Sequence, residues 1–522
     1  IAGGLVPDAA DEPTPSVLDA APTVRAGVAL PAARDEPSLS STWYCAGGTA
    51  ANPADDLADH VLLLANPTDR ARRARVTVLS GVIAPAPAVE STTPTTAGGQ
   101  APSTTTTAAP PDTTAPAPPR PAPVQQALEL PAQSRTELRL GDVAGVAGPL
   151  AGAVVEVDGA HIAVEHQITG SLGRATAPCS TTASTTWSFP WGVTVRGSRE
   201  LLVFMNPFPD DATVDIAFAT DEGVRETARF QGFIVPGRSV VGAYIDEDVT
   251  RKAQVSAQVQ VRGGRLVVDR IQTFDGTDGR EGITLGLGAP TPALTWMYPV
   301  GETGPGLGEQ VVVFNPGEEV AEVEVEVRLD DPTANEPPEP FELTVAPGRF
   351  SIVNVHEEGR VPAGVGHALI VRSLNGVPIT AERVNFAADP APRRGISATT
   401  GSPVGAPTWY FPGGGPVQAE RDQYLVLFNA NDTDPVGFRV TGFSKGQTIA
   451  VQGLQDGSIP AGGRVVIRLG DHIDREDLPV VVTADGPIVA ERGLYRIGGG
   501  GMAQSIGIPL DRAIVIPDPT AG

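Results

Sequence analysis

The sequence predicts an all-β protein built from four tandem immunoglobulin-like β-sandwich modules. Three observations predict it. A tryptophan recurs about every 110 residues over most of the chain, the apolar runs are short and rich in Val and Ile, and 60 glycines and 51 prolines interrupt them. We find no stretch of a dozen residues with the 3.6-residue periodicity of a helix. Because self-similarity at a fixed period reflects one folding unit per repeat, we expect four modules of one fold.

Each repeat opens on a Thr-Trp pair. The four tryptophans are Trp43, Trp187, Trp296 and Trp409. A large ring on an inner strand buries about 150 to 250 Å² and anchors two sheets against each other. We therefore expect these rings in equivalent buried positions, and we favour core packing over ligand stacking for all four.

About twenty residues after each tryptophan, an apolar run ends on an asparagine. These residues are Asn66, Asn206, Asn315 and Asn429. Proline follows the first three, and Ala430 follows the fourth. Because Asn can bond its own backbone and Pro cannot extend a ladder, the pattern predicts the end of a strand.

Strand-like alternation fills the rest of each repeat. Residues 322–327 alternate Glu with Val, and residues 254–261 place Val and Ala on a single face. Each module offers roughly seven short strands spaced about 8 to 15 residues apart, which suits an immunoglobulin-like sandwich. A propeller blade needs only about 40 to 45 residues. We therefore expect a row of separate sandwiches, arranged like beads.

An apolar stretch that carries an acid closes each repeat. The acids are Glu165, Asp269, Glu382 and Glu491. In Glu382-Arg383 and Glu491-Arg492 the two side chains of each step point to opposite faces of a strand. They are not expected to pair with each other, and each should instead bond a neighbouring strand or a loop backbone.

The repeats define the domain boundaries. We expect a flexible N-terminal stalk at 1–38, modules at 39–183, 184–292, 293–405 and 406–512, and a C-terminal tail at 513–522. Residues 84–124, rich in Thr, Pro and Ala, interrupt the first module between two predicted strands. This insertion has no aromatic residue and few large aliphatic ones, so we expect it to be disordered and dispensable for folding. Its Ser/Thr tracts with Pro fit either an O-glycosylated arm or an unmodified spacer.

Charge and hydropathy limit the partners and the compartment. With 37 basic and 61 acidic residues the chain carries a formal charge of −24, so nucleic acid and anionic membrane surfaces are poor partners. No stretch reaches the roughly 18 apolar residues of a membrane helix. The chain begins at Ile1, and we interpret it as part of an exported protein. We expect it outside the cytoplasm, secreted or anchored through a segment missing from this chain.

The two cysteines fit that compartment. Cys45 and Cys179 both map to terminal strands of the first module, which a sandwich often brings together. We predict a disulfide between them, with two free buried thiols as the alternative. The chain-entropy model gives such a bond about 4 to 5 kcal/mol, and it persists only under oxidising conditions.

From the sequence we predict no catalytic, cofactor-binding or metal-binding residue. His161 and His166 would lie on opposite faces of a strand, and nucleophile-elbow, P-loop and zinc-protease motifs are missing from the sequence. Acidic clusters at 210–211, 246–248 and 275–281 lack the spacing of a known calcium loop. Solvated acidic turns are the favoured interpretation there, with calcium as the weaker alternative.

Together, the Trp-Tyr opening, the apolar run into Asn-Pro, the Pro-Gly turn before a strand and the Ile-Val-Ala-Glu-Arg segment resemble a family of actinobacterial proteins. That family comprises exported or membrane-anchored proteins of unknown function, built from tandem immunoglobulin-like modules. The resemblance covers roughly residues 39–510. It implies the fold and the extracytoplasmic setting, and it supplies no catalytic residues.

Two classes of function remain. The first is a non-enzymatic cell-envelope protein that acts as a multidomain spacer, scaffold, or binding or adhesion module, with an unknown protein or glycan partner. The second is a carbohydrate-active enzyme or a glycan-recognition subunit. Binding should lie where the modules differ, and the candidates are Trp191 and the glycine loop at 498–501. An exposed Trp191 would favour sugar stacking, and a buried one would weaken that class.

Overall fold

The computed structural model describes residues 30–35, 38–49, 59–86, 121–330, 337–414, 417–418, 421–475, 478–496 and 501–511. Within these residues the chain is all β, with three short 3₁₀ turns. It forms four tandem β-sandwiches, so the prediction of an all-β protein built from tandem sandwich modules is confirmed. The predicted insertion lies mostly outside the described residues, as do the tail and residues 1–29 of the stalk.

The first two modules have eight strands each. Module 1 holds β1 (Ser40–Cys45), β2 (Asp59–Asn66), β3 (Arg72–Ile83), β4 (Val124–Leu130), β5 (Ser134–Arg139), η1 (Leu140–Asp142), β6 (Leu150–Asp158), β7 (Ala163–Gly170) and β8 (Gly173–Pro178). Module 2 holds β9 (Thr186–Phe189), β10 (Ser198–Asn206), β11 (Ala212–Thr220), β12 (Gly223–Val235), β13 (Ser239–Tyr244), β14 (Val255–Gly263), β15 (Val267–Asp275) and β16 (Glu281–Leu287).

The last two modules repeat the plan. Module 3 holds β17 (Thr295–Glu302), β18 (Leu307–Asn315), β19 (Ala321–Leu329), β20 (Phe341–Val345), β21 (Arg349–Asn354), η2 (Val355–Glu357), β22 (Gly366–Ser373), β23 (Thr380–Ala387) and β24 (Gly395–Thr400). Module 4 holds β25 (Ala406–Phe411), β26 (Val417–Gln418), β27 (Arg421–Phe428), β28 (Val436–Ser444), β29 (Gln447–Ala450), β30 (Gly457–Ile459), β31 (Arg464–Arg468), η3 (Leu469–Asp471), β32 (Val480–Arg496), β33 (Met502–Ile506) and β34 (Ile508–Pro509).

Modules 1 to 3 share one strand order, and module 4 follows it with additional short strands. In module 3 the sheet that carries the tryptophan runs β17-β22-β19-β20, and the sheet that carries the asparagine runs β21-β18-β23-β24. Modules 1 and 2 match this plan, and in module 4 the long strand β32 contributes to both sheets. We call the second sheet of each module its inner sheet.

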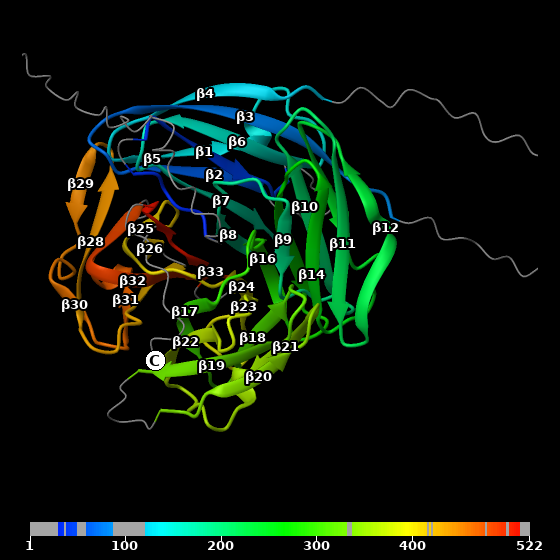
Figure 1. Cartoon of the computed structure of the whole chain (residues 1–522). Helices are drawn as coiled ribbons and strands as arrows, with labels where there is room; N and C mark the ends of the chain where they lie inside the picture. Colours follow the sequence, from blue (N-terminus) through cyan, green and yellow to red (C-terminus); the bar gives the residue numbers. More distant parts are fainter. Residues whose placement is uncertain are drawn as a thin grey trace, which may run out of the picture.

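The sequence led us to expect separate sandwiches in a row, but the four modules close into a ring (Figure 1). The last strand of each inner sheet packs at the centre, where β8 contacts β16 and β33, and β24 contacts the same two strands. Modules 1 and 2 are also joined by parallel pairing of β3 with β13.

The ring forms because the central strand of each inner sheet, the one that ends on the repeated asparagine, is apolar on both faces. In β18, Val311 and Val313 belong to the core of module 3, whereas Val312 faces the other way and packs with Trp191 of module 2. Uninterrupted apolar runs of this kind are typical of sheets covered on both sides.

Part of the predicted stalk belongs to the ring. Leu30 and Ala33 are buried, and Ala33 exchanges backbone hydrogen bonds with Pro509 and Asp511 beside β34. The beginning and the end of the described chain therefore lie next to each other, where modules 1 and 4 meet.

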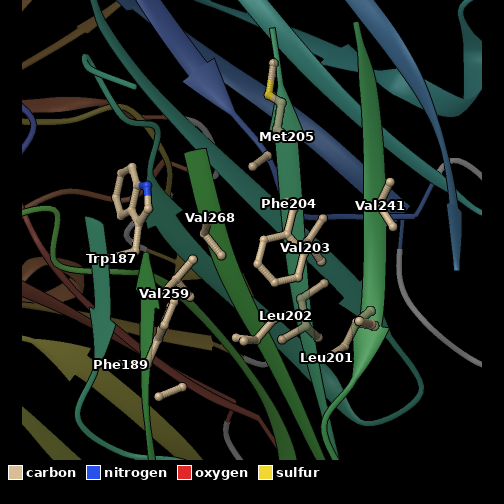
Figure 2. Close-up of a cluster of buried hydrophobic side chains, with 14 of the residues drawn as sticks. Trp187, Phe189, Leu201, Leu202, Val203, Phe204, Met205, Val241, Val259 and Val268 are labelled. Carbon is tan, nitrogen blue, oxygen red and sulfur yellow. The ribbon is translucent and has the colours of Figure 1, made fainter. Parts of the chain in front are cut away.

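The four repeated tryptophans are fully buried, each on the first strand of its module. Figure 2 shows Trp187 in the core of module 2, beside its cross-strand partner Val259. The indole Nε1 of Trp187 donates to the Leu266 carbonyl at 3.0 Å, and Trp296 and Trp409 donate to equivalent carbonyls. The Nε1 of Trp43 has no hydrogen-bond partner among the described residues.

The four repeated asparagines tie a strand end to a turn. The Oδ1 of Asn206 accepts from the Phe208 N–H at 3.1 Å, and its Nδ2 donates to the carbonyls of Asp210 and Val235. Asn66, Asn315 and Asn429 make the equivalent bonds, and all four are buried. Their role is structural, because each bond satisfies a backbone group where the ladder stops.

Candidate functional site

A repeated contact joins each module to the next around the ring. The segment just after each tryptophan, which is a loop in modules 1, 2 and 4 and part of β17 in module 3, donates a backbone N–H to the acid of the following module. The segment of module 4 reaches the first module. The donor is always the fourth residue after the tryptophan. The N···O distances are 2.6 Å for Gly47–Asp269, 3.1 Å for Trp191–Glu382, 3.0 Å for Val300–Glu491 and 2.8 Å for Gly413–Glu165. We call these contacts joints 1–2, 2–3, 3–4 and 4–1.

At three joints a buried arginine completes the contact. Arg270 pairs with Glu382 at 2.5 Å, Arg383 with Glu491 at 2.5 Å and Arg492 with Glu165 at 3.1 Å. Each guanidinium also donates to the carbonyl of its own loop, at Trp191, Val300 or Gly413. As expected, these side chains do not pair within their own Glu-Arg steps, and they bond backbone groups of a nearby segment. Their ionic partners in another module were not predicted. Removing one partner of such a buried pair typically costs about 3 to 5 kcal/mol.

An aromatic ring covers each of these arginines. The guanidinium lies 5.7 Å from the Phe189 ring centroid in module 2, 5.5 Å from Tyr298 in module 3 and 5.7 Å from Phe411 in module 4. The ring is always two residues after the tryptophan. A cation over an aromatic face is favourable, more so when both groups are desolvated.

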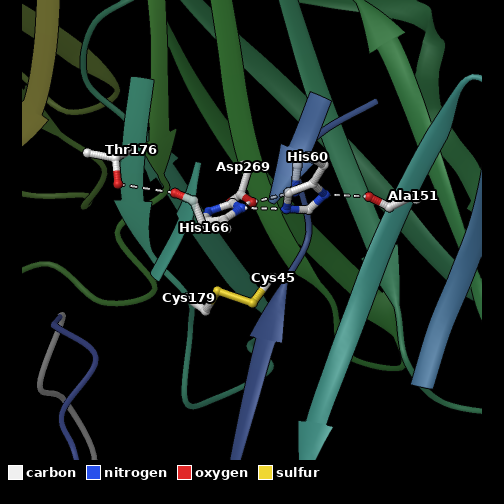
Figure 3. The surroundings of a disulfide bond; sticks show 8 residues. Cys45, His60, Ala151, His166, Thr176, Cys179 and Asp269 are labelled. Carbon is white, nitrogen blue, oxygen red and sulfur yellow. Dashed lines mark hydrogen bonds and ion pairs between the residues drawn. A yellow bond between two sulfur atoms is a disulfide. The ribbon is translucent and has the colours of Figure 1, made fainter. Parts of the chain in front are cut away.

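Joint 1–2 has neither the arginine nor the aromatic ring. His166 stands at the arginine position and Cys45 at the aromatic position, where Cys45 is bonded to Cys179 (Figure 3). The predicted disulfide is present, and it fits an extracytoplasmic protein. Among the described residues, no helix is long and apolar enough to cross a membrane.

A glycine follows each joint residue because a buried polar side chain lies beneath it. A Cβ on Gly48, Gly192 or Gly414 would overlap His60, Glu200 or Gln423, which all stand six residues before the repeated asparagine. Burial raises the pKa of Glu200 to about 8. Glu200 is therefore mostly neutral at pH 7, like the amide of Gln423 at the equivalent position.

A pocket lies at joint 4–1, where the ring closes. Its volume is about 590 Å³, and β2, β5 and β7 of module 1 line it together with the ends of β32 and β33. Val61 and Leu63 are among its apolar lining residues from module 1, and Tyr495 is among those from module 4.

The pocket exists because joint 4–1 lacks side chains that fill joint 2–3. There, Trp191, Phe274, Phe350 and Phe386 cluster around Val312. By strand register, the equivalent residues at joint 4–1 are Gly413, Arg496, Arg135 and Thr169, around Leu63. One glycine and three polar residues thus replace four aromatic rings.

The walls of the pocket carry both charges. Arg135 pairs with Glu137 at 2.5 Å and donates to the Gly414 carbonyl at 2.9 Å, so it fixes the loop of module 4 to module 1. Arg139 pairs with Asp59 across β5 and β2. With Thr169 beside them, these groups offer donors and acceptors to a polar molecule.

Trp191, expected from the sequence as a binding surface, is only 1% exposed. Its ring stacks on Phe274 at a centroid distance of 5.9 Å, inside joint 2–3. The uniqueness of Trp191 therefore reflects packing between modules, and the surface role expected for it is wrong. The other candidate, the glycine loop at 498–501, lies outside the described residues except for Gly501, which lines the pocket.

The acidic clusters are engaged in ion pairs and turns. Asp246 pairs with Arg199, Asp248 pairs with Arg229, and Asp211 accepts the Gly237 N–H. In the part of the chain that the structure describes, no group of three His, Cys, Asp or Glu residues is arranged to hold a metal ion.

Part of the chain is similar to a protein family, and parts are similar to solved structures. A family model described as a family of unknown function (DUF5719) matches residues 144–276, from β6 of module 1 to β15 of module 2. No curated protein matches the chain. A crystal structure of Thermotoga maritima 1070 is similar at 18% identity over 21% of this chain and 93% of that chain, with a TM-score of 0.19. The Anabaena sensory rhodopsin transducer is similar at 27% identity over 18% and 82%, with a TM-score of 0.15. At these TM-scores neither likeness bears on function.

Proposed function

We propose that this protein is a non-enzymatic binding module of the cell envelope, a closed ring whose ligand site is the pocket at joint 4–1. It acts outside the cytoplasm, secreted or anchored, and the Cys45–Cys179 disulfide supports that setting. A ring spans less distance than a row of the same modules. We therefore favour binding or scaffolding over a role as a spacer.

The observation that carries the proposal is the difference between joints 2–3 and 4–1. The residues that recur in every module are accounted for by folding and by the joints. The pocket, in contrast, arises where Thr169 and Arg496 stand in place of Phe386 and Phe274. A volume of about 590 Å³ falls in the range of roughly 300 to 1,000 Å³ that is typical of small-molecule sites.

The chemistry of the pocket favours a polar, hydroxyl-rich ligand such as a glycan of the envelope. The carboxylate of Glu137, the guanidinium of Arg139 and the hydroxyl of Thr169 line the pocket together with apolar residues such as Val61 and Leu63. Sugars offer both hydroxyl groups and apolar faces, so they match this mixture. The formal charge of −24 argues against a nucleic acid as the partner.

The test is a glycan array probed with the labelled protein and two variants. Thr169→Phe places in the pocket the side chain that module 3 carries as Phe386, and it should abolish binding. Thr273→Phe makes the same change at the equivalent position of module 2, outside the pocket, and it should leave binding intact. Glycan binding that survives Thr169→Phe would place the site elsewhere. Cleavage of a bound glycan would contradict a non-enzymatic role and favour the carbohydrate-active enzyme.

A further inference from the structure

Joint 1–2 is built from three buried titratable groups in place of the arginine pair. His60 on β2 and His166 on β7 belong to module 1, and Asp269 on β15 belongs to module 2 (Figure 3). The Nε2 of His60 lies 3.0 Å from the Nδ1 of His166, and the Nε2 of His166 lies 3.7 Å from Asp269 Oδ2. All three side chains are at least 98% buried.

The hydrogen-bond chain fixes where the protons lie. The Ala151 carbonyl only accepts, so the His60 Nδ1 at 2.8 Å must donate to it. The His60 Nε2 then carries a lone pair and accepts from the Nδ1–H of His166. This leaves the Nε2 of His166 facing Asp269 at 3.7 Å, without a hydrogen-bond partner among the described residues. The further proton of the closed joint lies on the Asp269 carboxyl.

Other groups that face this chain do not titrate near neutral pH. The backbone of Ala46 and Gly47 bonds Asp269, the Gly47 backbone also bonds His166, and the Thr176 hydroxyl donates to the His166 carbonyl. Arg270, next to Asp269 on β15, is engaged at joint 2–3.

We propose that joint 1–2 is an acid-sensitive latch. A second proton on His60 sets two N–H groups against each other and breaks the His60–His166 bond. His166 then shifts against Asp269, and the Gly47–Asp269 contact opens, while the β3–β13 pairing still joins modules 1 and 2. The three arginine joints stay closed, because arginine remains charged and their hydrogen bonds do not depend on histidine.

The proton count gives the sign and the size of the effect. Burial lowers the pKa of His60 to about 4 and holds the pKa of His166 well below its ordinary 6.5, whereas burial raises the pKa of Asp269 to about 7. Between about pH 6 and 4 the closed joint holds one proton, on Asp269. The open joint holds two, one on each exposed histidine. Opening therefore takes up one proton, and the open fraction rises about tenfold for each pH unit of acidification.

The Asp269 carboxyl acts in the opposite direction. Its raised pKa favours the closed joint in acid, and this contribution is lost as the pH rises toward 7. The proton on Asp269 offsets the proton uptake of one of the two histidines. The closed fraction of joint 1–2 is therefore highest from about pH 6.5 upward.

Amide hydrogen exchange tests the latch directly on the full chain. The Gly47 N–H is held by Asp269 at joint 1–2, and the Val300 N–H is held by Glu491 at the equivalent joint 3–4. The ratio of their protection factors removes the intrinsic pH dependence of exchange and any global unfolding. The ratio of Gly47 to Val300 should fall about tenfold per pH unit below pH 6. A ratio that stays constant from pH 7.5 to 4.5 would overturn the proposal.

Two variants change the proton count in opposite directions. His60→Gln introduces the residue that module 4 carries at this position, Gln423, and leaves one proton in both states, so the pH dependence should vanish. Asp269→Asn removes the compensating proton of the closed joint, so the slope should steepen to about a hundredfold per unit. Glu491→Gln is the matched control at an arginine joint, and it should weaken Val300 protection by the same factor at every pH. If His60→Gln and Asp269→Asn both keep the wild-type slope, the latch is refuted.

Discussion

At the scale of single residues, the repeated tryptophans differ in one hydrogen bond. Trp187 donates from its Nε1 to the Leu266 carbonyl, whereas the Nε1 of Trp43 is buried with no partner among the described residues. A buried carbonyl that loses its donor costs about 1 to 3 kcal/mol, whereas removing a donor that has no partner carries no such cost.

We therefore predict different outcomes for one substitution at two equivalent sites. Trp187→Phe should lower the free energy of unfolding by about 1 to 3 kcal/mol more than Trp43→Phe, since only the former strands a carbonyl. Chemical denaturation of both variants, followed by the fluorescence of the remaining tryptophans, measures the difference. Equal losses would show that the indole hydrogen bond contributes nothing to stability.

Sequence reasoning succeeded at residues whose role lies inside one module. The burial of Trp296, the turn at Asn315 and the Cys45–Cys179 bond all follow from local pattern and module topology. It failed at Trp191, because a side chain unique to one module can fill a joint as readily as it can bind a ligand.

At the scale of elements, β3 and β4 hold module 1 together on either side of the predicted insertion. They pair in antiparallel register from Arg72–Leu130 to Val78–Val124, and β3 also pairs with β6. Both strands are placed in the sheet by pairs between described residues.

We predict that residues 87–120 can be replaced by a short Gly-Ser loop. The entropy of closing a loop grows only with the logarithm of its length, about 0.6 kcal/mol per doubling, so shortening it should leave stability unchanged or slightly higher. Calorimetry of the variant and the parent would compare the unfolding of module 1. A fall of several kcal/mol would mean that these residues pack on the sandwich.

The strand pattern indicates that the inner sheets are covered on both faces, although the repeat period alone suggests separate modules. Runs such as residues 311–313 are apolar at consecutive positions, and a sheet with one wet face should alternate. The acid at the end of each repeat was found in the sequence, but its partner was not. Glu165 and Arg492 are 327 residues apart and meet only because four modules turn through a full circle.

At the scale of the whole molecule, each joint contributes to one closed structure. Arg492→Ala should lower the free energy of unfolding by about 3 to 5 kcal/mol, because it leaves Glu165 buried and unpaired. The control is Arg75→Ala, which breaks a solvent-exposed pair with Glu156 and should cost no more than about 1 kcal/mol. Similar losses from both changes, measured by denaturant unfolding, would show that the buried pair does not hold the ring closed.

The central claim is that module 4 closes on module 1, and the distance between these modules tests it most directly. The two native cysteines are bonded to each other and do not react with thiol dyes. A donor and an acceptor dye would therefore label only new cysteines introduced at the exposed positions Glu129 and Gln447. The ring predicts strong Förster transfer over less than one module width, which is roughly 35 Å for about 110 residues. Separate modules in a row would put the dyes roughly 100 Å apart, and the absence of transfer would contradict the closed ring.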